Sequence, residues 1–254
     1  MIKTFILAAR SRNGLLFYTG IVCLMLSILM GLLIFVDHTE ILGINAWIKP
    51  LKFFLSIWIM SWTMAWMLWY LDAKKMVKIY SLILVITMFV EMAAICLQSY
   101  RGTTSHFNIS SAFNGIVFAL MGIAILTFTI ATAFICFLFF RQQKFNLSEE
   151  MVWSIRIGLF LFLLFSAEGG IMISKMSHTV GLKDGNAGIP FLNWSINAGD
   201  LRVAHFFGMH SLQVIPLVGY FLTSGKRQVF FFSALYFLWV IVLFIQALNG
   251  TAFL

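Results

Sequence analysis

The amino-acid sequence predicts an all-α membrane protein, built as a bundle of seven transmembrane helices. Of the 254 residues, 61% are hydrophobic and only 10% are charged, whereas soluble domains carry roughly 25% charged residues. The apolar residues come in long blocks, and each block is long enough to cross a hydrocarbon core of about 30 Å at 1.5 Å per residue. The net charge of +8 comes from short clusters between the blocks. This distribution is typical of topology signals and argues against nucleic acid as a partner.

The predicted spans form one domain, residues 14–254. They cover residues 14–36, 51–71, 78–98, 112–140, 152–174, 202–223 and 229–248. Residues 1–13 are basic and amphipathic, which predicts a helix lying in the membrane interface. The three cysteines fall inside apolar blocks, so a disulfide framework is not expected.

Lysine and arginine are unevenly distributed over the segments between the spans. If the N-terminus lies inside, the inner segments hold more of these residues than the outer segments. The positive-inside rule then predicts an inside N-terminus and an outside C-terminus, in the inner (plasma) membrane of the cell. All histidines fall on or near the predicted outer side. The longest outer segment, residues 175–200, is rich in glycine and is expected to form a lid over the mouth of the bundle.

The stretch GDLRVAHFFGMHSLQVIP, residues 199–216, joins polar chemistry to an apolar span. At 100° per residue, Arg202, His205 and Gln213 share one face of the sixth span, and His210 lies at its edge. Asp200 directly precedes this helix and is expected to serve as its N-cap.

Two glutamates lie inside other predicted spans, at a depth similar to that of His210. Glu91 in the third span and Glu168 in the fifth lie about 10–15 Å from the outer ends of their helices. A charged group at mid-span costs at least about 2.5 kcal/mol, so each glutamate is expected to have a partner. Together with His210 and Arg202 they are the candidate catalytic residues; the alternative is that they form ion pairs that only fix helix packing.

The second span carries four tryptophans along one face, and Trp62 is one of them. Such a stripe could stack a flat cofactor or a polyprenyl tail, or could simply pack against neighbouring helices. Lys49 and Lys52 at the outer end of this span could bind an anionic headgroup or a substrate phosphate, or could extend toward water. The candidate cofactor-binding residues are Arg101, Trp62 and Gln213.

The motifs KPLKF, RGTTSHFN, SHTVG, NWS and GDLRVAHFFGMHSLQ are spread over most of the chain. With these motifs the chain resembles a group of uncharacterised bacterial seven-span integral membrane proteins. The resemblance runs nearly from end to end and implies the membrane fold, but it implies no activity.

Three functions fit the candidate residues. In the first, a membrane-embedded enzyme acts on a lipid or other hydrophobic substrate, and His205, His210 and His106 bind a metal ion or exchange protons. In the second, the protein is a b-type haem or quinone electron-transfer protein, with haem b held by His106 and His205. Arg101 or Arg202 would then bind a haem propionate.

In the third, the protein is a proton-coupled transporter with Glu91 and Glu168 as relay groups. The predicted inner half of the bundle carries only scattered threonines, at positions such as 127, 129 and 132. No inverted repeat is visible either, and both observations argue against a transporter. Substrate, cofactor and oligomeric state do not follow from the sequence.

Overall fold

A computed structural model describes residues 2–254, with side chains from residue 6 onward. The chain divides into two compact units, residues 1–135 and 136–254, and each is described by itself. Within the described part, six helices are long and apolar enough to cross a membrane. The all-helical prediction is therefore confirmed, and the six helices are typical of a multi-pass membrane protein in contact with lipid.

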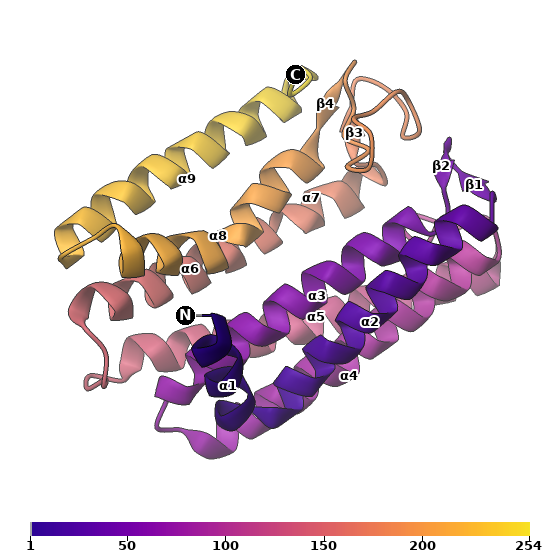
Figure 1. Ribbon diagram of the computed structural model, residues 1–254. Coiled ribbons are helices and arrows are strands. Elements are labelled where there is room, and N and C mark those ends of the chain that lie inside the picture. The colour runs from indigo at the N-terminus through magenta and orange to yellow at the C-terminus, as the bar shows by residue number, and fades with distance from the viewer. Residues whose placement is uncertain (1) are drawn as a thin grey trace. The chain divides into compact units, whose positions relative to one another are not determined.

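Unit 1 consists of helices joined by short segments and one small hairpin. Its elements are α1 (Ile2–Arg12), α2 (Gly14–Val36), β1 (Glu40–Ile41), β2 (Ile44–Asn45), α3 (Ile48–Met67), the 3-10 helix η1 (Leu68–Tyr70), α4 (Lys74–Tyr100) and most of α5 (Ala112–Arg141). Figure 1 shows α2, α3 and α4 running side by side, and each of the three packs against the other two.

The predicted interfacial segment, residues 1–13, coincides with α1, except that Met1 lies outside the described residues. The next helix begins at Asn13, whose side-chain oxygen accepts a hydrogen bond of 3.2 Å from the Leu16 N–H. This N-cap satisfies one of the free donors of the first turn of α2, and it explains the boundary between the two helices.

Unit 2 holds the end of α5 and three longer helices. Its other elements are α6 (Glu149–Ser166), α7 (Glu168–Lys175), β3 (Thr179–Val180), β4 (Gly199–Asp200), α8 (Leu201–Phe221) and α9 (Lys226–Leu248). In Figure 1, α8 runs between α6 and α9, and it packs against both. The strands β3 and β4 pair antiparallel, which ties residues 175–200 to the beginning of α8.

The structure differs from the predicted spans at two places. The fifth apolar block is interrupted at Ala167, which separates α6 from α7. The Gly170 N–H donates to the Ala167 carbonyl at 3.0 Å, and this bond forms a tighter turn at the break. α8 coincides with the sixth predicted span, but it is not among the six helices that meet the criteria for a membrane span. Its two histidines, Arg202 and Gln213 lower its mean hydropathy.

Arg156 of α6 links this helix to the end of α5. Its guanidinium donates to the carbonyls of Phe139 and Gln142, each at 2.9 Å, and it lies over the rings of Trp153, Phe140 and Phe145 at 5.0–5.6 Å. The last carbonyls of a helix lack partners within the helix. Arg156 therefore caps α5 from a neighbouring helix, a role that the spacing of apolar residues does not predict.

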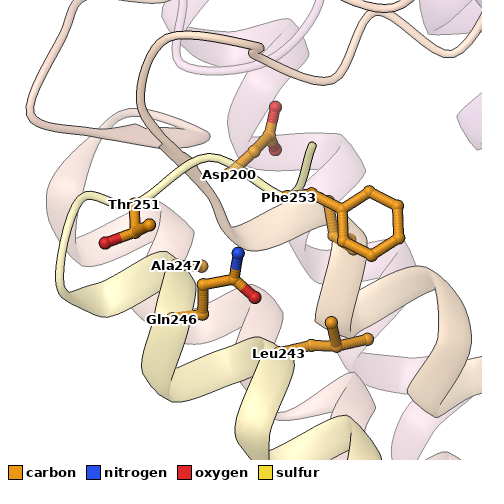
Figure 2. A pocket seen from close by; sticks show the side chains of 7 residues that line it. Asp200, Leu243, Gln246, Ala247, Thr251 and Phe253 are labelled. Atoms are coloured by element: carbon orange, nitrogen blue, oxygen red, sulfur yellow. The ribbon is translucent and has the colours of Figure 1, made fainter.

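The C-terminal tail folds back over the start of α8. Figure 2 shows a hollow lined by Asp200 at that start, by Leu243 and Gln246 of α9, and by Thr251 and Phe253 of the tail. The surrounding atoms leave no room in it for a ligand. Gly199 lies directly against the Ala247 backbone, and the hollow is therefore a packing feature and carries no part of the candidate site.

Candidate functional site

In unit 1, three ionisable side chains meet where α3 begins and α4 ends. The Lys49 ammonium lies 3.1 Å from His106 Nδ1, and His106 Nε2 lies 3.9 Å from Glu91 Oε1. Glu91 is only 3% exposed, whereas the imidazole of His106 remains 23% exposed. The three groups therefore lead from the edge of the unit to a buried carboxyl group.

The hydrogen bonds of His106 fix which ring nitrogen carries the proton. An ammonium group can only donate, so Nδ1 must accept from Lys49. The Ser105 hydroxyl also lies 3.1 Å from Nδ1. In a neutral ring the proton then resides on Nε2, the nitrogen that faces Glu91.

The loop that carries His106 is held by its own side chains. Asn108 is buried and donates to the Thr103 hydroxyl at 2.9 Å and to the Thr104 carbonyl at 2.8 Å. Phe107 adopts φ +56°, a left-handed conformation that is uncommon for a non-glycine residue. These bonds set the position of His106, which was predicted from the sequence as a metal ligand, a proton-exchanging group or a haem ligand.

Arg101, predicted to bind a cofactor, lies at the same end of the unit. Its guanidinium donates to Gln98 Oε1 and to Asn114 Oδ1, both at 2.8 Å, and Gln98 donates to Asn114 at 3.0 Å. The network joins α4 to α5. Its bonds give Arg101 a structural role, while binding of a propionate stays a prediction.

Glu91 belongs to a line of buried polar residues that follows α4 through both of its halves. The line comprises Gln98, Glu91, Thr87, Ser81 and Tyr80. Near the beginning of α4, the Tyr80 hydroxyl lies 3.2 Å from the Thr132 hydroxyl and Ser81 accepts a bond of 2.8 Å from Asn13. The first half of α4 therefore carries buried polar side chains at Tyr80 and Ser81, in addition to the threonines named from the sequence.

Trp62 packs between α3 and α2. Its ring stacks on Phe17 with centroids 5.3 Å apart, its Nε1 donates to the Phe17 carbonyl at 3.1 Å, and Gly20 leaves the space that the ring occupies. These contacts agree with the packing interpretation of the tryptophan stripe. A cofactor at Trp62 stays a prediction.

In unit 2, Glu168 begins α7 and is only 5% exposed. Neither of its carboxyl oxygens has a hydrogen-bond partner among residues 2–254, and the same holds for Oε2 of Glu91. An ionised carboxyl group buried without a partner is strongly unfavourable. Glu168 must therefore hold a proton or bind a cation or other ligand, whereas Glu91 has His106 3.9 Å from its Oε1.

The two histidines of α8 have different partners. His205 Nδ1 lies 2.8 Å from the Phe165 carbonyl of α6, and a methyl group added at Gly169, the residue after Glu168, would lie 3.6 Å from the His205 ring. His210 Nδ1 lies 3.2 Å from Gln213 Oε1 of its own helix. Thus His205 binds the neighbouring helix α6, whereas His210 and Gln213 pair with each other.

Arg202, a candidate catalytic residue, is tied to the beginning of its helix. Asp200 accepts a bond of 3.0 Å from the Arg202 N–H and another of 2.9 Å from Arg202 Nε. The predicted N-cap role of Asp200 is therefore confirmed. Arg202 also donates to the Asn193 carbonyl, so it holds residues 175–200 against α8.

Residues 175–200 contain a histidine–aspartate pair that was not predicted from the sequence. His178 Nδ1 lies 2.6 Å from Asp184 Oδ2. Burial alone would raise the pKa of Asp184, but hydrogen bonds from His178 and Ser177 and the charge of His178 outweigh it and hold that pKa well below its usual range. The signal available in the sequence was the six-residue spacing in SHTVGLKD, which allows a turn to bring the two side chains together.

The predicted site on three helices combined residues that belong to different units. Glu91 and His106 lie in unit 1, whereas Glu168, His205 and His210 lie in unit 2, so their convergence stays a prediction. Within the described part of the chain, no three His, Cys, Asp or Glu side chains are grouped to hold a metal ion. Metal and haem binding likewise remain predictions. No protein-family model, curated protein or solved structure matches the chain.

Proposed function

We propose that this protein is a proton-coupled membrane transport protein in which Glu91 is the central proton-carrying group. The observation that carries the proposal is the line of buried polar residues along α4, with Glu91 near its middle. Buried ionisable groups in spans are costly and mark proton and ion pathways. A residue that served only a site open to one side would not need polar neighbours in both halves of the helix.

The group at the end of the line has the chemistry needed to load Glu91. His106 Nε2–H passes its proton to the Glu91 carboxylate while Nδ1 takes a proton from the Lys49 ammonium, so the imidazole stays neutral throughout. The products are a neutral carboxylic acid, a neutral amine and the Nδ1–H tautomer of His106. Lys49 then takes up a proton from water, and the ring returns to the Nε2–H tautomer by exchanging protons with water before the next transfer. The N–O distance of 3.9 Å exceeds a hydrogen bond, so this transfer needs a small side-chain movement or a bridging water.

Beyond Glu91 the line continues toward the beginning of α4. Thr87 lies one turn away and Tyr80 about two turns farther. The Thr87 hydroxyl donates to the Ile83 carbonyl at 2.8 Å, which leaves its oxygen able to accept a hydrogen bond from a water molecule. Ordered water would have to bridge these gaps, as it commonly does between buried polar groups.

The same proposal includes the membrane topology. We place seven spans in the inner membrane, with α8 as the sixth span and with the N-terminus inside. The support is the length of α8, 21 residues, its packing between α6 and α9, and the distribution of lysine and arginine over the connecting segments.

Proton flux into proteoliposomes tests the function. The purified protein is reconstituted with an enclosed pH-sensitive dye, and a pH jump is applied outside. We expect faster equilibration than in protein-free liposomes, and a decrease of at least about tenfold for Glu91→Gln, because the amide cannot carry a proton. Equal rates for the wild type and Glu91→Gln, or no flux above protein-free liposomes, would refute the proposal.

A pair of matched variants tests the route along α4. Thr87→Val removes a hydroxyl that is buried beside Glu91, whereas Thr127→Val removes one that is exposed on α5. We expect Thr87→Val to reduce the flux several-fold and Thr127→Val to leave it unchanged. Equal effects of the two variants would show that the buried line is not the route.

The metal and haem predictions are tested separately. Elemental analysis and an absorption spectrum of the purified protein are compared with those of a His205→Ala/His210→Ala variant. Stoichiometric metal that is lost in the variant would favour an enzyme acting on a lipid or other hydrophobic substrate, and iron with a Soret band would favour a haem protein.

A further inference from the structure

The second buried glutamate lies at the inner end of a second group of histidines. His178 is the last residue before β3, and its carbonyl accepts a bond of 3.0 Å from the Leu201 N–H, the first residue of α8. His205 follows Leu201 by one helical turn, so the backbone of His178 lies beside the turn of α8 that leads to His205. His205 Cε1 in turn lies near Gly169, the residue after Glu168: a methyl group added at Gly169 would be 3.6 Å from it.

Asp184 is built to hold His178 in one orientation and one tautomer. Its carboxylate accepts hydrogen bonds from the His178 and Thr179 N–H groups and from the Ser177 and Thr179 hydroxyls, at 2.9–3.1 Å. An ionised carboxylate can only accept, so His178 Nδ1 carries the proton and donates to Asp184. A neutral His178 therefore has no proton on Nε2, which can act as a base, as in the His–Asp pairs of hydrolases.

The buried carboxyl group of Glu168 is the group that would need such a base. Its two oxygens lack partners in the described part of the chain, and it is 5% exposed. A carboxyl group with this burial exchanges its proton only if another group carries the proton to and from water. The Phe165 carbonyl holds the proton of a neutral His205 on Nδ1, which leaves Nε2 of that ring as an acceptor as well.

We propose that His178, oriented by Asp184, is the residue through which the buried carboxyl of Glu168 exchanges protons with water, by way of His205. In the outward direction, Glu168 gives its proton to His205 Nε2 through a bridging water, since its oxygens have no direct hydrogen bond to His205. His205 passes the proton on Nε2, again by way of water, to His178 Nε2, and His178 releases it to bulk water. Glu168 ends as a carboxylate and both imidazoles return to the neutral state. This inference extends the proposed proton handling to unit 2, but it does not depend on the route along α4.

The exchange is measured by infrared spectroscopy of the purified protein. The C=O stretch of a protonated carboxyl group shifts when H₂O is replaced by D₂O, and the band that disappears in Glu168→Gln belongs to Glu168. We expect His178→Gln to slow the shift of this band about 100-fold, the lower part of the range for a positioned acid–base group. His38→Gln, which changes an exposed histidine of unit 1, should leave the rate unchanged.

Two further measurements distinguish proton transfer from a structural role of His178. Added imidazole should restore fast exchange in His178→Gln, since a small base can replace a lost carrier but cannot repair a misfolded loop. Asp184→Asn should also slow the exchange, because an amide that donates to Nδ1 moves the ring proton to Nε2. Wild-type exchange in His178→Gln, a slow variant that imidazole fails to rescue, or the absence of a Glu168 band would each overturn the inference.

The outcome is independent of the proteoliposome experiment. Failure of the proposed function appears as a flux that does not depend on Glu91. Failure of the present inference appears as an exchange rate at Glu168 that does not depend on His178.

Discussion

Replacement of Glu168 by methionine should stabilise the protein. The carboxyl group is 5% exposed and neither oxygen has a hydrogen-bond partner within residues 2–254. Mutational data put the cost of burying such a group at about 1–3 kcal/mol. Methionine has a similar length and no group to desolvate, so we expect Glu168→Met to raise the free energy of unfolding by about 1–3 kcal/mol.

The assay is reversible unfolding in mixed micelles at increasing fractions of sodium dodecyl sulfate, followed by circular dichroism. The matched control is Glu149→Met at the beginning of α6. Glu149 bonds Lys226 at 2.7 Å, but its side chain is 60% exposed, and exposed pairs contribute little. Its replacement should therefore change stability by less than about 0.5 kcal/mol.

A loss of 1 kcal/mol or more in Glu168→Met would refute this reasoning. It would mean that the carboxyl group has a stabilising partner in the folded protein, such as a bound cation. A gain in stability would instead show that the wild-type protein keeps a buried carboxyl group at a cost in stability, as expected of a residue kept for function.

Three other changes have defined outcomes. Arg156→Met removes two charge-assisted hydrogen bonds to carbonyls at the end of α5, and we expect the same unfolding assay to show a loss of about 2–4 kcal/mol. A loss under about 0.5 kcal/mol would show that water replaces these bonds. Gly199→Ala places a methyl group against the Ala247 carbonyl, so the backbone must shift, and thermal unfolding should show a loss of about 1–3 kcal/mol; an unchanged midpoint would contradict the packing of this tail. The lowered pKa of Asp184 adds stability that is fully present above the ordinary aspartate value of 3.8 and is lost as the pH falls below it. Amide hydrogen exchange of residues 177–184 should therefore accelerate in acid in the wild type, and Asp184→Asn should exchange quickly at neutral pH already.

The helices agree closely with the apolar blocks of the sequence. Residues 14–36 were expected as the first span and form α2, and residues 202–223 correspond to α8. A block of apolar residues must form a helix in lipid, since no other structure of a single segment satisfies its backbone hydrogen bonds. The break at Ala167 was not expected, because the apolar composition continues across it.

The candidate site was predictable as a set of residues but not as a set of contacts. Burial of Glu91 and Glu168 followed from their positions within apolar blocks, and the N-cap role of Asp200 followed from the residues around it. The pairing of Glu91 with His106 did not follow from any periodicity. It depends on a loop whose conformation is set by Asn108 and by the left-handed Phe107.

The sequence by itself determined the all-helical class, the approximate positions of the long helices and the burial of two glutamates, because each depends on the polarity of consecutive residues. Only the tertiary structure decided which side chains meet these glutamates and how α5 is capped. His106, His178 and Arg156 reach their partners across loops or between helices. Such contacts depend on how distant segments pack, a property that local hydrophobic patterning does not encode.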